Sequence, residues 1–275
     1  MTKTWFITGA ARGFGRLLTE KLLARGDKVF ATVRREGSLT LEHPNLRVLH
    51  MDLTDPASIR GSIDAAFREG RIDVIIANAG YGLFGAAEEL SDAAISRQIA
   101  TNLTGAIDLV RAALPHLRGQ QGGRFLQVSS EGGQLAYPGF SLYHATKWGI
   151  EGFIEAVAQE VAGFGIEMTL IEPGPTATEF ATSVDMAQTI PAYEESNVGA
   201  VRRDLRAIAE GGTGDSFAGL ADAGRSVDAM IALAEQQELP RRLVLGSTAF
   251  DNIGATLRAR LSELKAQRDV PLAAD

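Results

Sequence analysis

Short apolar runs alternate with amphipathic stretches along most of the 275-residue chain. The apolar runs predict strands over residues 5–7, 28–33, 46–49, 74–76, 124–128, 167–171 and 242–245. Apolar residues at helical spacing predict helices over residues 17–23, 59–67, 93–114, 143–161 and 253–265. Strands that alternate with helices favour a parallel sheet covered on both faces. We therefore expect a doubly wound, three-layered α/β domain over residues 1–275.

One long segment, residues 174–225, departs from this alternation. It contains Pro175, Pro191, the pair Gly211–Gly212 and Gly219, with amphipathic patches between them. A connection of this length is uncommon in a compact domain unless it covers a functional site. We expect short helices that form a lid after the sixth strand; the alternative is a surface excursion without function.

Composition excludes several classes of function. The chain has no cysteine, and its four histidines lack metal-ligand spacing, so we expect no metal site. A net charge of −7 argues against a general affinity for nucleic acid or anionic membranes. No apolar run approaches the ~20 residues that span a bilayer. The expected location is the cytoplasm.

A glycine-rich turn follows the first predicted strand and opens the first helix. It spans Thr8 to Gly15 and reads TGAARGFG. Glycines let the backbone approach a pyrophosphate closely, and the helix N-terminus offers free N–H groups and the positive end of its dipole. The turn therefore predicts dinucleotide binding by a Rossmann-type domain.

Tyr143 and Lys147 are four residues apart in a predicted helix. Residues at this spacing lie on the same helix face, so the lysine cation is expected near the phenol. A nearby cation favours the phenolate and lowers the tyrosine pKa from its ordinary value of ~10. The pair therefore suggests a tyrosine that exchanges a proton with substrate. The spacing alone is common, and a surface helix is the alternative.

These motifs together resemble the short-chain dehydrogenase/reductase family. Further matches at or after the predicted strand ends are "MDLT" with Asp52 and Leu53, "ANAG" with Asn78, Ala79 and Gly80, "VSS" with Ser130, and "EPGPTAT" with Pro173, Gly174 and Thr178. Another match, "TNLTG" with Asn102, lies in the long helix predicted over residues 93–114. Ala77 and Glu172 stand where the family usually has asparagine. We expect both departures to affect only packing.

The resemblance implies roles for individual residues. Tyr143 would be the proton donor and acceptor, and Lys147 would tune it and bind the nicotinamide ribose. Ser130 would bond the substrate oxygen, and Asn102 would hold a water that links Lys147 to solvent. The implied cofactor contacts are Thr8, Gly9, Arg12, Gly13, Phe14, Gly15, Arg34, Asp52, Leu53, Asn78, Ala79, Gly80, Tyr143, Lys147, Pro173, Gly174 and Thr178.

The second strand indicates which nicotinamide cofactor is bound. It ends at Val33, where an acid would grip the adenosine ribose of NAD, and Arg34 follows. Arg12 in the glycine turn is expected to face the same region. A guanidinium pairs well with a phosphate dianion, so we expect NADP(H). The alternative is two solvated arginines and an NAD-linked alcohol dehydrogenase.

The substrate is expected to be a hydrophobic ketone or aldehyde, or the corresponding alcohol. Aromatic and apolar residues on loops and in the lid could line its pocket: Tyr81, Phe84, Leu135, Tyr137, Phe140, Phe180 and Tyr193. We expect half of them to pack the loops instead. The stretches "ATVRR", "ANAGYG" and "RRLVLG" resemble the 17β-hydroxysteroid dehydrogenase-like branch, which acts on many substrates.

Two other functions remain open. A sugar-nucleotide epimerase of the same fold would need a larger C-terminal domain, and a non-catalytic NADP(H)-binding regulator would usually lack the tyrosine or the lysine. By resemblance, we expect a homodimer or homotetramer formed through helices 93–114 and 143–161. Ile150, Phe153 and Val157 could belong to that interface or to the core.

Overall fold

A computed structural model describes residues 2–210 and 219–268. Its centre is a seven-stranded sheet in the order β3-β2-β1-β4-β6-β7-β9, and every neighbouring pair is parallel. The strands are β1 Thr4–Ile7, β2 Lys28–Val33, β3 Leu46–His50, β4 Val74–Ala77, β6 Gly123–Val128, β7 Ile166–Pro173 and β9 Arg242–Leu245. All seven predicted strands are confirmed.

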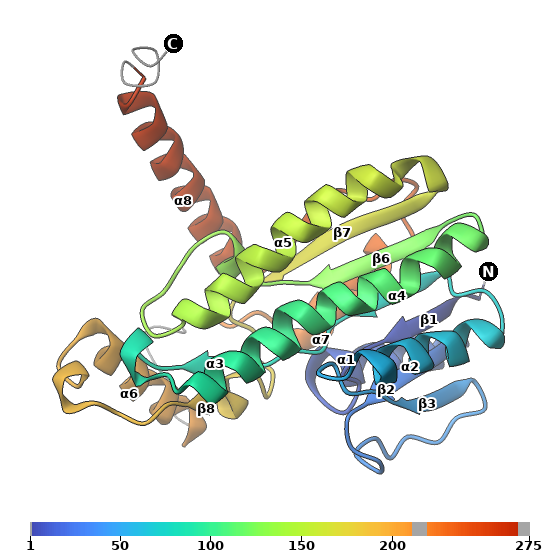
Figure 1. The fold of residues 1–275 in the computed structure, drawn as a ribbon, viewed down its shortest axis with the longest axis horizontal. Helices are drawn as coiled ribbons and strands as arrows, with labels where there is room; N and C mark the ends of the chain where they lie inside the picture. The colour runs from blue at the N-terminus through green and yellow to red at the C-terminus, as the bar shows by residue number, and fades with distance from the viewer. Residues whose placement is uncertain (1, 211–218, 269–275) are drawn as a thin grey trace.

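Helices cover both faces of the sheet, which confirms the predicted three layers (Figure 1). One apolar core joins the sheet to α2 Pro56–Arg68, α4 Gly105–Gly119 and α5 Ser141–Val161. The second core joins the other face to α1 Gly13–Ala24 and α7 Ala223–Leu233. Strands β1 and β4 are apolar on both faces, because neither face meets solvent.

The strand order indicates which part of the sheet binds a ligand. From β1 the chain passes to β2 on one side, while β4 lies on the other, so the connections diverge at β1 and β4. In such sheets ligands bind at the carboxyl ends of the strands where the order reverses. The glycine turn follows β1 and therefore lies at this point.

The helix predicted over residues 93–114 is interrupted. It consists of α3 Asp92–Ile99, a π-helical turn η2 Ala100–Thr104, and α4. A Cβ on Gly105 would come within 2.3 Å of the Leu53 carbonyl oxygen, so glycine allows the helix to pass close to the loop after β3. The π-helical turn carries Asn102, and such turns often occur at functional sites.

Short helices follow β7 as expected, and their role as a lid stays a prediction. After β7 the chain forms the short helix η5 Ala181–Ser183, β8 Asp185–Met186, the short helix η6 Pro191–Tyr193 and α6 Asn197–Ala209. Strand β8 pairs with β5 Leu83–Phe84, which attaches this segment to the body. Residues 211–218 of the predicted lid lie outside the described residues. Figure 1 shows α6 and β8 together at one end of the molecule.

Regular structure resumes slightly before residue 225, the predicted end of the lid segment. Ala221 forms an isolated parallel bridge with Thr176, just beyond the end of β7. Helix α7 then begins at Ala223 and packs its apolar residues against α1 in the core. The sequence reading missed this helix because the glycines and prolines before it suggested one continuous irregular segment.

The last helix, α8 Ser247–Ala266, begins earlier than predicted and projects away from the body (Figure 1). Its first turn is anchored, because Ala249 and Ile253 are buried. Farther along, Leu257, Leu261 and Leu264 are exposed. Among residues 2–210 and 219–268, no helix combines the length and hydrophobicity that crossing a membrane requires.

Candidate active site

The glycine turn between β1 and α1 forms an open cradle. Gly9 and Gly13 have φ angles of +70° and +55°, which favour glycine. A Cβ on Gly15 would lie 2.4 Å from the Gly9 carbonyl oxygen, so α1 begins in close contact with the turn. Arg12 precedes α1, and no side chain caps that helix end. The first N–H groups of α1 are therefore left for a ligand.

The loop after β4 fixes this cradle. Thr8 Oγ1 accepts hydrogen bonds from the main-chain N–H groups of Asn78 and Ala79, at 2.9 Å each. Asn78 Nδ2 donates to Thr8 O at 2.9 Å. Gly80 approaches Asn102, since a Cβ there would lie 3.3 Å from Asn102 Oδ1. A rigid glycine turn at a free helix N-terminus fits a pyrophosphate.

Charged residues lie beside the cradle, at the ends of neighbouring strands. Ala10 N–H donates to Thr32 O at 2.9 Å, which holds the glycine turn against the end of β2. Arg12 lies two residues after Ala10, and Arg34 lies two residues after Thr32. Both are exposed, and neither forms an ion pair within 4 Å with any residue in the described ranges. Val33 is buried.

Asp52, after β3, belongs to the same region. Its Oδ1 accepts bonds from Thr54 N–H and Thr54 Oγ1, both at 2.8 Å. The bond from the Thr54 N–H is the largest cause of a lowered Asp52 pKa, and the Arg34 charge contributes. The carboxylate therefore stays ionised and faces the side of the cradle that carries Arg34.

Tyr143, Lys147 and Ser130 come together at the carboxyl edge. Tyr143 and Lys147 lie one turn apart in α5, and Lys147 Nζ is 5.6 Å from the Tyr143 ring centroid. Ser130 follows β6, and its side chain lies close enough to Tyr143 to act on the tyrosine pKa. Its Oγ also accepts from Gly132 N–H at 3.1 Å, so the serine both caps the next turn and contacts the tyrosine.

The expected lowering of the tyrosine pKa is absent. Burial raises the pKa of Tyr143 to about 12, although the Ser130 hydrogen bond acts in the opposite direction. Burial also lowers the pKa of Lys147 to about 8, against the charge of Glu151. Lys147 Nζ donates to Val128 O at 3.0 Å. Burial is therefore the largest cause that sets the tyrosine pKa, and the charges of Glu131 and Glu151 act in the same direction.

The side-chain amide of Asn102 is hydrogen-bonded to the main chain of Tyr81. Its Oδ1 accepts from Tyr81 N–H at 3.1 Å, and its Nδ2 donates to Tyr81 O at 2.8 Å. The amide therefore fixes the loop after β4 to the π-helical turn. The role of Asn102 in holding a water stays a prediction.

The remaining predicted cofactor contacts surround the same edge. Phe14 lies in the first turn of α1, and Leu53 is buried after β3. Pro173 ends β7, and its carbonyl accepts a long 3.5 Å bond from Ser130 Oγ. Thr178 Oγ1 accepts from Phe180 N–H at 3.3 Å. Gly174 is required by close packing, since a Cβ would lie 2.8 Å from Ala249 Cβ.

Aromatic residues lie around Tyr143. The Phe180 ring, from the segment after β7, lies 5.8 Å from that of Tyr143, and the Phe140 ring lies 6.1 Å from it. Phe84 and Phe140 are buried in a cluster with Leu205 of α6. Of the other predicted pocket residues, Leu135 is buried, Tyr137 is exposed, and Tyr81 and Tyr193 are partly buried.

Sequence reasoning missed several groups around the site. His144 Nε2 accepts from Tyr137 N–H and its Nδ1 donates to Gly132 O, both at 2.8 Å, so the ring is neutral and ties this loop to α5. Glu131 accepts from the Tyr137 hydroxyl at 3.0 Å and from Asn252 of α8 at 3.2 Å. For His144, the only signal in the sequence was its position directly after Tyr143.

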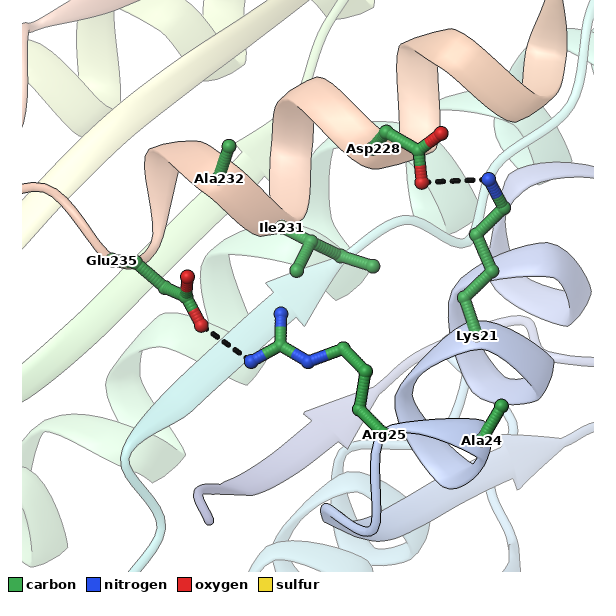
Figure 2. A pocket seen from close by; sticks show the side chains of 7 residues that line it. All are labelled: Lys21, Ala24, Arg25, Asp228, Ile231, Ala232 and Glu235. Atoms are coloured by element: carbon green, nitrogen blue, oxygen red, sulfur yellow. Dashed lines mark hydrogen bonds and ion pairs between the residues drawn. The ribbon is translucent and has the colours of Figure 1, made fainter. Parts of the chain in front are cut away.

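A separate pocket lies between α1 and α7 (Figure 2). Lys21 Nζ pairs with Asp228 at 2.6 Å, and Arg25 pairs with Glu235. Lys21 lies in the last turn of α1 and Arg25 is its C-cap, just before the chain returns to the start of β2. This pocket therefore lies toward the edge of the sheet opposite the cradle.

Comparisons with known proteins agree with this geometry. Residues 3–189 match the family model described as short chain dehydrogenase. An oxidoreductase of Botryotinia fuckeliana is 33% identical over 99% of both chains. Human 17-beta-hydroxysteroid dehydrogenase type 1 is 33% identical over 65% of this chain and 58% of its own. The structure of a short-chain dehydrogenase from Streptomyces avermitilis superposes with a TM-score of 0.89, at 33% identity over 100% of this chain and 99% of that one.

The fold itself accepts either nicotinamide cofactor. Structures with this fold from Burkholderia cenocepacia and Burkholderia phymatum, both 24% identical to this chain, contain NADP and NAD respectively. They cover 97% of this chain, and 97% and 95% of their own, with TM-scores of 0.75 and 0.76. The chain is an oxidoreductase that belongs to the short-chain dehydrogenase family.

Proposed function

We propose that this protein is an NADP(H)-dependent oxidoreductase that interconverts a hydrophobic ketone or aldehyde and its alcohol. The observation that supports this most strongly is the grouping of the partly buried Tyr143 and Ser130 with the buried Lys147 at the edge of the sheet that carries the glycine cradle. A proton donor, a hydrogen-bond donor and a cation meet there at the carboxyl ends of β6 and the start of α5. Carbonyl reduction needs these three functions next to a nucleotide site.

The chain's own residues handle the proton and the developing charge. Tyr143 is protonated at neutral pH, since burial raises its pKa, and its hydroxyl donates to the substrate oxygen during reduction. Ser130 Oγ provides a second donor at that oxygen and stabilises negative charge on it. Lys147 holds positive charge beneath the tyrosine ring. When bound, the nicotinamide ring supplies or accepts the hydride.

Arg12 and Arg34 support a preference for NADP(H). Both guanidinium groups are exposed at the ends of β1 and β2, and neither is engaged in an ion pair in the described part of the chain. Val33 offers no carboxylate to bind a ribose 2′-hydroxyl or to repel a 2′-phosphate. Two free cations and no acid favour a phosphate at this position. The NAD-linked alternative requires a binding group that these strand ends lack.

The lid supports a hydrophobic substrate. The rings of Phe140 and Phe180 lie beside the ring of Tyr143, and Val184 packs against the same apolar cluster as Tyr143. Their contacts would exclude water from the proton transfer. As to assembly, we propose an oligomer, although Ile150 and Val157 cannot form its interface because both are buried in the core.

A paired titration tests the proposal. NADPH and NADH are titrated separately into the protein, followed by fluorescence, and hydrophobic ketones are then screened with the tighter cofactor. We expect NADPH to bind at least tenfold more tightly, which corresponds to about 1.4 kcal/mol. Tighter NADH binding would instead support the NAD-linked alcohol dehydrogenase.

Tyr143→Phe separates an enzyme from a non-catalytic regulator. The substitution keeps the ring packing against Phe180 and Phe140 and removes only the hydroxyl, so cofactor binding should persist while turnover is lost. Unchanged turnover in this variant contradicts the mechanism. Binding of NADPH without turnover of any carbonyl by the unmodified protein favours the regulator.

A further inference from the structure

A buried charge cluster lies beside the catalytic residues. Arg242 of β9 contacts Glu151 Oε2 at 2.6 Å, Glu155 Oε1 at 2.6 Å and the carboxylate of Glu172. The side chains of Glu151 and Glu172 are 4% and 0% exposed, whereas that of Glu155 is 45% exposed. Two buried acids therefore share one guanidinium, so loss of Arg242 would leave uncompensated charge in the interior.

Glu151 contacts the chain on both sides of the catalytic serine. Its Oε1 accepts a hydrogen bond of 2.5 Å from Ser129 Oγ, directly before Ser130. After Ser130, a Cβ on Gly133 would come within 1.7 Å of the same oxygen. The glycine therefore allows the carboxylate to lie against the loop. Movement of Glu151 would release the segment that places Ser130.

Glu151 is also one helical turn from Lys147. Lys147 is 8% exposed, and its ammonium donates to Val128 O, two residues before Ser130. The charge of Glu151 opposes the loss of the lysine proton that burial favours. The end of β6 is therefore held at two consecutive residues. Lys147 binds the carbonyl of Val128, and Glu151 binds the hydroxyl of Ser129.

The other charged groups around this pair have different partners. Glu131 of η3 (Glu131–Gly133) accepts from Tyr137 and Asn252. His144 of α5 is neutral between two main-chain groups. Glu172 of β7 accepts from Gln134 Nε2 at 2.6 Å and contacts Arg242, and burial followed by the Glu151 charge raises its pKa. Glu172 is therefore more readily protonated than an ordinary glutamate.

We propose that Glu151, anchored by Arg242, is a positioning residue of the reaction: it holds the loop that carries Ser130 and supplies the buried negative charge that keeps Lys147 cationic. The part that concerns turnover rests on the proposed function. The cluster also assigns a role to Glu172, which stands where the family usually has asparagine. Its carboxylate helps to hold Arg242 in reach of Glu151.

The test compares Glu151→Gln with Glu155→Gln. Both variants lose one carboxylate next to Arg242, but only Glu151 is buried and contacts Ser129. Lys147 is one of five lysines, so its ammonium can be followed by NMR of protein with labelled lysine side chains, using Lys147→Met for assignment. We expect the Lys147 titration midpoint to fall by about one pH unit in Glu151→Gln. In Glu155→Gln it should move by less than about 0.3 unit, since solvent screens the exposed charge.

An unchanged Lys147 midpoint in Glu151→Gln overturns the electrostatic part of the proposal. This readout needs no turnover, so it remains decisive even if no carbonyl substrate is found and the proposed function fails. Ser129→Ala tests the positioning part and replaces Glu151→Gln if that variant does not fold. It keeps the charge and removes the hydrogen bond, so kcat should fall about tenfold while the Lys147 midpoint stays at the wild-type value. Wild-type kcat in Ser129→Ala contradicts the positioning role.

Discussion

Glu89 and Arg202 form a buried ion pair between the body and the lid. Arg202 Nη2 lies 2.5 Å from Glu89 Oε2, and their side chains are 4% and 0% exposed. Glu89 also accepts from the main-chain N–H groups of Ala86 and Ile190, at 2.7 and 2.9 Å. Although burial raises it, these bonds and the Arg202 charge hold the Glu89 pKa below its ordinary value. One carboxylate thus ties α6 and the η6 region to the loop after β5.

Arg202→Met should destabilise the protein. Removal of the guanidinium leaves the Glu89 carboxylate buried without its counter-charge, which typically costs about 3–5 kcal/mol. We expect urea unfolding to show a loss of this size, together with faster proteolysis within α6. Arg203→Met is the matched control, because Arg203 is exposed on the next position of the same helix. Its effect should stay within about 0.5 kcal/mol. Equal stability of the two variants would contradict a latching role for the pair.

Arg34→Ala should weaken NADPH binding selectively. Loss of a cation that faces the 2′-phosphate should raise the Kd for NADPH about tenfold, or about 1.4 kcal/mol, and leave that for NADH within about twofold. Fluorescence titration of both cofactors measures this difference. Arg71→Ala provides the control, since Arg71 precedes β4 at the opposite edge of the sheet and pairs with Asp73. A parallel loss of NADH affinity in Arg34→Ala would place this arginine away from the phosphate.

Lys147→Met should abolish turnover but stabilise the fold at neutral pH. Burial lowers the Lys147 pKa to about 8, from about 10.4 in the unfolded chain. The cationic lysine therefore costs the folded state stability, and its removal should gain roughly 1–3 kcal/mol at pH 7. Between pH 8 and pH ~10.4 the unfolded chain binds more protons at this site, so wild-type stability rises relative to the variant.

Urea unfolding of both proteins at pH 7, 9 and 10.5 measures this convergence. The advantage of Lys147→Met should be largest at pH 7 and shrink steadily above pH 8. A difference that is constant across this range would show that the lysine carries no electrostatic cost.

Gly133→Ala and Gly152→Ala should have opposite effects. A Cβ on Gly133 would meet Glu151 Oε1 at 1.7 Å, so the substitution must displace the carboxylate or the loop that follows Ser130. We expect kcat to fall at least about tenfold and the free energy of unfolding to decrease. A Cβ on Gly152, on the exposed face of α5, meets nothing within 4 Å. Alanine there should stabilise the helix by about 0.5–1 kcal/mol and leave kcat unchanged. Full activity of Gly133→Ala would contradict the close packing of the serine loop.

Most of the fold could be read from periodicity. Strands such as Val74–Ala77 are continuous apolar runs because both sheet faces are covered, and the glycine turn indicated where the sheet binds its ligand. The interruption at Asn102 and the helix that begins at Ala223 were missed. The first depends on the passage of Gly105 past the Leu53 carbonyl, and the second follows a glycine-rich segment whose local signals indicate a loop.

The sequence by itself determined the parallel sheet, the cradle from Thr8 to Gly15 and the proximity of Tyr143 to Lys147. These follow from short-range rules, in which side-chain spacing and backbone freedom act over a few residues. Only the tertiary structure decided the direction of the Tyr143 pKa, the pairing of Glu89 with Arg202 and the sharing of Arg242 by Glu151 and Glu172. The energy of a buried charge depends on which distant segments remove water from it and which supply its partner, and neither is encoded in local sequence.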